Sequence, residues 1–235
     1  HCISSAASDV YKRQLQLESI PATFLLLQAH RHPGRWDLGY AASKSFEISG
    51  PGVDTAIRWS TIAIIIMLVF AVGWALYRLC AGGWTTRTTM AFFSVMVLLL
   101  IATNKVFSPQ YIVWLGPLLA VVIRQRLPQG FTTLRVVQRL LAVCAIIAAA
   151  LGTLVYPFNY DYIWHYVGEN MFPVYLLVAR NILIVVMAII GLIWFALEVA
   201  LAGKLERPGI HQPHAPSALA QPVLRRRGGR HSLRS

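Results

Sequence analysis

A polar segment between two apolar stretches holds the residues whose types and spacing suit chemistry best. Asn104, Lys105, Ser108 and Gln110 lie within seven residues, and Tyr111 follows at once. Amide, hydroxyl and ammonium groups in this arrangement form a cluster of hydrogen-bonding groups that a ligand at the membrane edge could use. The same residues also fit a plain helix start, with Ser108 as the cap and Tyr111 in an interfacial aromatic belt. The segment alone leaves both interpretations open.

Other polar groups lie within or beside apolar sequence. Arg180 and Asn181 fall inside the last long apolar stretch, where ionisable groups either face a polar cavity or extend to the lipid headgroups. Glu18 lies in a segment expected to form a short helix at the membrane interface. His30 and His32 are spaced as a pair of metal ligands, but without a third ligand a surface role is favoured. No metal site is therefore predicted.

Composition shows what kind of molecule must position these residues. The chain of 235 residues is 57% hydrophobic and only 13% charged, with a formal net charge of +12. Soluble domains average about 25% charged residues, so an ordinary soluble fold is excluded. The positive charge fits a nucleic-acid-binding protein, but in so apolar a chain it is better explained by Lys and Arg on the cytoplasmic side of a membrane. Membrane lipid is the expected partner, and nucleic acid is not.

The apolar stretches predict an all-α polytopic membrane protein, because a membrane helix needs about 20 mostly apolar residues. We expect five spans, at about 58–78, 87–104, 106–124, 139–160 and 173–203. Residues 15–57 are expected to form an outward-facing segment with an interfacial helix and a small β-ribbon within 40–48. Residues 1–14 look like non-native, adapter-derived sequence, and residues 204–235 are expected to be a disordered basic tail.

The distribution of basic residues predicts the orientation. The segments 78–87, 124–139 and 204–234 contain two, four and seven Lys or Arg residues, whereas the alternate connections contain only Lys105. Cytoplasmic loops carry the excess of Lys and Arg. We therefore expect a multi-pass plasma-membrane protein with a cytoplasmic C-terminus and with the polar segment around Ser108 on the extracytoplasmic face.

The stretch NKVFSPQYIVWLGPLLA, residues 104–120, resembles the FSPQY-x-x-WL-x-P hairpin of actinobacterial membrane glycosyltransferases of family eighty-seven, in the C superfamily. That family contains polyprenol-phosphate-mannose-dependent α-mannosyltransferases. The segments LQLESIPAT (15–23), SGPGVD (49–54) and ARNILI (179–184) agree with it in order and spacing. The resemblance covers about residues 15–203 and implies the C-terminal part of a longer enzyme, truncated at its N-terminus.

The resemblance implies transfer of a hexose, expected to be mannose, from a polyprenyl-phosphate donor to a glycan acceptor on the outer face. The departing phosphate needs cations nearby, and Lys105 and Arg180 are the basic side chains at that depth. Candidates for binding the sugar or the lipid are Asn104, Ser108, Gln110, Tyr111, Glu18 and Asn181. No cofactor is expected beyond the lipid-linked donor, and the sequence contains no Gly-rich nucleotide loop.

The resemblance also places the general base in an outward loop upstream of these residues. The catalytic residue therefore stays unassigned, and we expect the chain to be inactive by itself. Residues 160–171 match nothing in the family, which leaves the acceptor open. The alternatives are a transporter or lipid flippase and a non-catalytic assembly subunit. A transporter is expected to have charged or broken segments in the middle of the membrane and repeated halves. The first, third and fourth predicted spans contain no charge, and the sequence shows no internal repeat.

Overall fold

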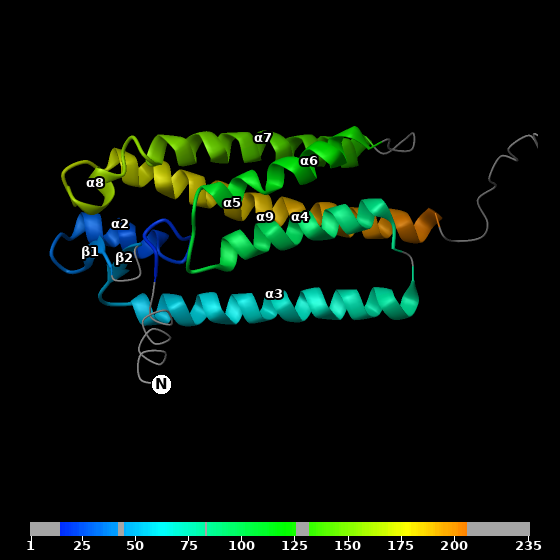
Figure 1. Ribbon diagram of the computed structural model, residues 1–235, viewed down its shortest axis with the longest axis horizontal. Coiled ribbons are helices and arrows are strands. Elements are labelled where there is room, and N and C mark those ends of the chain that lie inside the picture. The colour runs from blue at the N-terminus through cyan, green and yellow to red at the C-terminus, as the bar shows by residue number, and fades with distance from the viewer. Residues whose placement is uncertain (1–14, 42–44, 83, 126–131, 206–235) are drawn as a thin grey trace, which may run out of the picture.

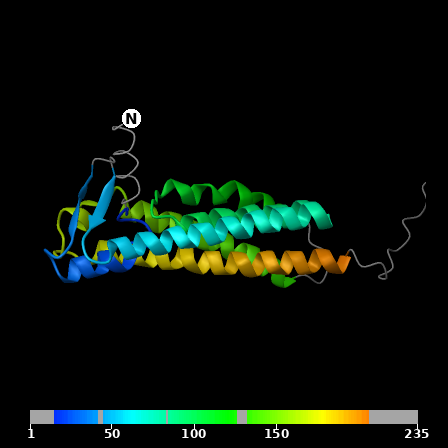
Figure 2. The ribbon, with the colours of Figure 1, turned by 90° about the horizontal axis from the view of Figure 1, so that it is seen from below.

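The computed structural model describes residues 15–41, 45–82, 84–125 and 132–205, so the expectations for residues 1–14 and 206–235 lie outside it. Long helices run side by side, and small elements cover one end of them, which we call the capped end (Figures 1 and 2). The elements are α2 (Thr23–Arg31), β1 (Asp37–Tyr40), β2 (Phe46–Ser49), α3 (Val53–Ala81), α4 (Thr86–Thr103), α5 (Gln110–Val113), α6 (Leu115–Arg124), α7 (Thr132–Val155), α8 (Asp161–Trp164) and α9 (Phe172–Leu205).

Four of the described helices, α3, α4, α7 and α9, are long and apolar enough to cross a membrane. They contain 29, 18, 24 and 34 residues, against the roughly 20 that a bilayer requires. Their positions confirm the first, second, fourth and fifth predicted spans, with ends that shift by several residues. The chain is therefore a helical, multi-pass membrane protein.

The third predicted span, 106–124, is wrong as a full-length helix. The chain is extended at Asn104, and the helical part is divided into α5 and α6. Pro117 explains the division, because proline has no N–H to donate to the carbonyl of Val113, four residues earlier, where α5 ends. The segment Gln110–Arg124 would rise about 22 Å, less than the roughly 30 Å of hydrocarbon.

The main core lies where α4, α6, α7 and α9 pack together. Gly191 allows α4 and α9 to approach closely, since a Cβ atom at this position would lie 2.9 Å from Leu98 Cδ1. In contrast, α3 packs mainly on α4 and leaves large apolar side chains such as Ile66 and Leu79 exposed. Exposed apolar faces of this extent are expected where a helix meets lipid.

A buried polar cluster holds the bundle at the end opposite the cap. Glu198 on α9 is 2% exposed and accepts two hydrogen bonds from the guanidinium of Arg87 on α4, at 3.1 and 3.0 Å. Gln138 on α7 and Trp194 on α9 donate to the same carboxylate at 3.3 and 3.2 Å. Its hydrogen bonds therefore link three membrane helices.

The cap is built from the segment expected to face outward. The helix expected in this segment is α2, but it begins only at Thr23, so Glu18 lies in a turn before the helix and not in it. The predicted ribbon is the antiparallel pair β1–β2, in which Tyr40 lies opposite Phe46. A second core forms beneath it from residues of the N-terminal segment, α8 and the start of α9, such as Leu17, Ile163 and Leu177. The cap therefore packs directly onto the ends of the membrane helices.

Candidate functional site

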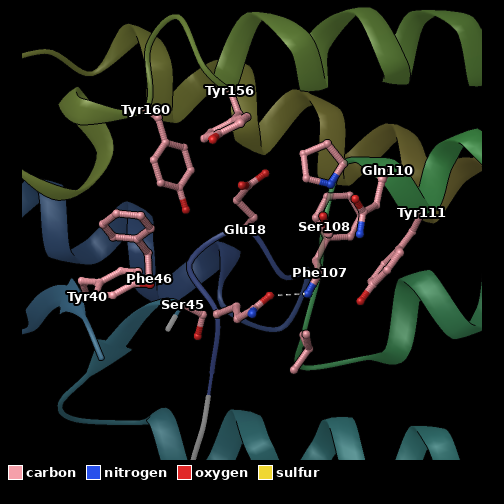
Figure 3. A pocket seen from close by; sticks show the side chains of 13 residues that line it. Glu18, Tyr40, Ser45, Phe46, Phe107, Ser108, Gln110, Tyr111, Tyr156 and Tyr160 are labelled. Carbon is pink, nitrogen blue, oxygen red and sulfur yellow. Dashed lines mark hydrogen bonds between the residues drawn. The ribbon is translucent and has the colours of Figure 1, made fainter. Parts of the chain in front are cut away.

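A cavity of about 490 Å³ lies at the capped end (Figure 3). Its lining combines three segments that are far apart in the sequence, 16–18, 106–111 and 156–160, with part of the β-ribbon. The lining residues are Gln16, Glu18, Tyr40, Ser45, Phe46, Val106, Phe107, Ser108, Pro109, Gln110, Tyr111, Tyr156 and Tyr160. Four of the expected binding residues, Glu18, Ser108, Gln110 and Tyr111, thus lie around one cavity.

The polar segment around Ser108 is held in place by the N-terminal segment. The backbone N–H of Gln16 donates to the carbonyl of Lys105 at 3.1 Å, and the Gln16 side-chain oxygen accepts from the N–H of Phe107 at 2.8 Å. The N-cap residue of α5 is Pro109 rather than Ser108, so the simple capping interpretation of Ser108 is wrong. The sequence reasoning missed Gln16, although it belongs to the quoted segment LQLESIPAT.

Arg180 is paired within the protein. It is fully buried, and its Nη1 lies 2.6 Å from Glu18 Oε2, while Nη2 donates to the Glu18 carbonyl at 2.9 Å. Its Nε donates to Asn181 Oδ1 at 3.1 Å, and the guanidinium lies over the ring of Phe107, 4.3 Å from the centroid. The expectation that Arg180 is a cation for the donor phosphate is therefore wrong, because its charge is already paired with that of Glu18.

The other expected ligands lie beside the cavity rather than in its lining. Asn181 donates to the carbonyl of Glu18 and to the hydroxyl of Thr23, which fixes the N-terminal segment on α9. Asn104 accepts from the N–H of Val106 at 3.1 Å and so shapes the turn after α4. Partial burial lowers the pKa of Lys105, and the nearby charge of Glu47 opposes this effect.

Aromatic side chains form much of the cavity wall. The ring of Tyr160 packs on Tyr156 and Phe46 with centroids 5.4 and 5.1 Å away. Burial, followed by the charge of Glu18, raises the pKa of Tyr160, while the charge of Arg180 opposes this effect. Tyr160 therefore keeps its proton and remains a hydrogen-bond donor beside Glu18. Apolar rings with a few placed polar groups are typical of small-molecule sites.

The histidine pair does not form a metal centre. The surface role expected for His30 is wrong, because its imidazole is buried. Its Nε2 lies 2.9 Å from the carbonyl of Ile163, and its Nδ1 accepts from the N–H of Gly168 at 3.1 Å. Both ring nitrogens are thus used to join α2 to α8 and to the turn that follows it, as a neutral ring with its proton on Nε2. Within the part of the chain that the structure describes, no three His, Cys, Asp or Glu side chains gather as metal ligands.

An apolar groove of about 370 Å³ lies between the α5–α6 segment and α7. It is lined by Ile112, Val113, Gly116, Leu119, Ala120, Ile123, Ala142, Ala145, Ile146 and Ala149. Within α5, Gln110 and Tyr111 line the polar cavity, and the next two residues line the groove. A polar and an apolar hollow therefore meet at one short helix.

Comparison of the chain with protein-family models, with curated proteins and with solved structures gives no match. The resemblance to membrane glycosyltransferases therefore stays a prediction from the sequence, and the geometry of the cavity is the basis for a functional proposal.

Proposed function

We propose that this chain is part of an integral membrane hexosyltransferase, and that the cavity at the capped end binds the sugar of a polyprenyl-phosphate donor. The observation that carries the proposal is the convergence of Glu18, Ser108 and Gln110 with aromatic rings at one end of an apolar helical bundle. Hydroxyl, amide and carboxylate groups are the side chains that bind sugar hydroxyls. The hexose is mannose, as the sequence resemblance implies.

The shape of the two hollows favours an amphiphilic ligand. A lipid-linked sugar has a polar head and a long hydrocarbon chain, and α5 separates a polar cavity from an apolar groove. With the sugar beside Gln110, the chain of the lipid leaves past Val113 toward the membrane. A nucleotide sugar has no hydrocarbon chain that could occupy the apolar groove.

The proposed reaction transfers the sugar to a glycan or glycolipid of the cell envelope. The acceptor hydroxyl attacks C1 of the sugar, the bond from C1 to the phosphate oxygen breaks, and its electron pair leaves with the polyprenyl phosphate. The hydroxyl proton passes to an acidic base, which the resemblance assigns to a loop preceding residue 15. Lys105 neutralises the charge that develops on the phosphate, and Arg180 acts through Glu18.

In this proposal the capped end faces outward across the plasma membrane, with the C-terminus in the cytoplasm. The excess of Lys and Arg in 78–87, 124–139 and 204–234 supports that orientation. The donor, the acceptor and membrane lipid are then the partners of the site, and no other cofactor is required.

The test is mannose transfer from polyprenyl-phosphate mannose by the full-length protein in liposomes. Gln110→Leu is expected to lower kcat/KM at least tenfold. Lys105→Gln is expected to lower kcat by an amount that corresponds to a loss of about 2–4 kcal/mol of transition-state stabilisation. Arg58→Gln is the matched control, because Arg58 is exposed and does not line the cavity. Movement of intact donor across the bilayer without transfer would favour the transporter alternative instead.

A further inference from the structure

Glu18 is the acidic residue of the cavity lining, and it is fixed at both its backbone and its side chain. Its carbonyl accepts from Arg180 and Asn181, and its carboxylate accepts from Arg180 Nη1 at 2.6 Å. Figure 3 shows the carboxylate among the cavity side chains, with the hydroxyl of Tyr160 directed toward it. The residue is only 7% exposed, so its position depends on these contacts.

The carboxylate retains acceptor capacity for a ligand. An ionised carboxylate offers about four lone-pair sites on its two oxygens. Arg180 occupies one site, and the Tyr160 hydroxyl lies toward another. Glu18 lines the cavity together with Ser108 and Gln110, so a ligand bound there can donate to the remaining sites (Figure 3). A group that only accepts hydrogen bonds recognises donors, and the donors of a neutral sugar are its hydroxyls.

Arg180 has a different role from that of a ligand. It is fully buried, and its Nε, Nη1 and Nη2 all donate to Glu18 or Asn181. The ring of Phe107 covers one face of the guanidinium. Its charge compensates that of the Glu18 carboxylate and its hydrogen bonds hold the residue in place. This pairing matters because an unpaired buried charge is strongly unfavourable.

We propose that Glu18 selects the sugar, its carboxylate accepting hydrogen bonds from neighbouring hydroxyls of an uncharged hexose, and that Arg180 is a positioning residue that holds it. This assignment rests on the proposed function of the cavity. It predicts selection against acidic sugars, because a sugar that carries its own carboxylate would place that anion beside the carboxylate of Glu18. Like charges in such juxtaposition suppress the binding of the wrong partner.

The test measures binding of three lipids to the chain in nanodiscs: polyprenyl-phosphate mannose, the same lipid with mannuronic acid, and polyprenyl phosphate without sugar. Glu18→Gln alone leaves Arg180 without a counter-charge, so the informative variant is Glu18→Gln combined with Arg180→Gln. Glu169→Gln is the control, because Glu169 is an exposed carboxylate of the capped end. The ratio of affinities within one variant does not depend on how much of that variant is folded.

Wild-type protein and the control are expected to bind the mannose lipid at least tenfold more tightly than the mannuronic lipid. The double variant is expected to lose that discrimination while its affinity for the sugar-free lipid stays within twofold of wild type. If the double variant keeps the discrimination, Glu18 only neutralises Arg180 and the assignment is wrong. If wild type binds the mannose and sugar-free lipids equally, the proposed function itself fails, and the assignment fails with it.

Discussion

Replacing Arg87 by Met should destabilise the bundle, because it leaves the buried carboxylate of Glu198 without its counter-ion. Removing one partner of a buried ion pair costs about 3–5 kcal/mol. Glu198 is 2% exposed, whereas the Arg87 side chain is 20% exposed, so water still reaches part of the pair. We therefore expect Arg87→Met to lower the free energy of unfolding by about 3 kcal/mol, the lower end of this range. Gln138 and Trp194 still donate to the carboxylate, which keeps the loss from being larger.

A second variant separates the charge from the packing. Combining Arg87→Met with Glu198→Gln removes the unpaired charge, while the amide oxygen still accepts from Gln138 and Trp194. We expect this pair of substitutions to recover roughly 2 kcal/mol relative to Arg87→Met alone, since a neutral buried group without its partner costs less than a charged one. The assay is reversible unfolding in mixed micelles followed by circular dichroism. Arg139→Met, at an exposed position next to Gln138, should change stability by less than about 0.5 kcal/mol.

A loss of less than about 1 kcal/mol in the free energy of unfolding of Arg87→Met would contradict this expectation. That value is typical of a solvent-exposed salt bridge, and it would mean that water reaches Glu198 freely. The clamp between α4, α7 and α9 would then contribute little to holding the bundle together.

Three further outcomes are expected. In a cysteine-free background, impermeant thiol reagents should label Phe158→Cys but not Gln125→Cys in intact cells, and the reverse pattern would contradict the orientation. Burial lowers the pKa of His30 in the folded protein, so its contribution to stability is complete above about pH 6.5 and is lost as the pH falls below that value. His30→Gln should therefore flatten the pH profile of the free energy of unfolding, and an unchanged profile would show that the pH dependence does not come from His30. Gly191→Val should lower the free energy of unfolding by about 1–3 kcal/mol, because the added side chain overpacks α4 against α9. Gly73→Val, in open space on α3, should not cause this loss, and equal losses in both variants would indicate an effect of helix propensity instead.

The membrane helices could be predicted from the sequence, because about 20 consecutive apolar residues leave few other structures. The third span was wrong as one full-length helix, for a local reason. Counting apolar residues from 106 to 124 ignores Pro117, whose missing N–H interrupts the helix at Val113. A ribbon within 40–48 was predicted and is present as β1–β2, whereas the short helix expected from residue 15 begins only at Thr23.

The site was only partly predictable. Ser108, Gln110 and Tyr111 stood out because they are polar or aromatic within one short segment. The partner of Arg180 did not, since Glu18 lies 162 positions away, and a single sequence carries no signal for a contact at that separation. Gln16 was missed because it acts on the backbone of Phe107, and no residue type marks that role.

Photoaffinity labelling tests the central claim, that the cavity at the capped end binds a lipid-linked sugar, most directly. The probe is polyprenyl-phosphate mannose with a diazirine on the sugar, added to the chain in nanodiscs and mapped by mass spectrometry of peptides. We expect label in residues 15–19, 106–111 and 156–160, and we expect excess unlabelled donor to remove all of it. Label elsewhere, such as on the exposed face of α3, or label that unlabelled donor does not displace, would contradict it.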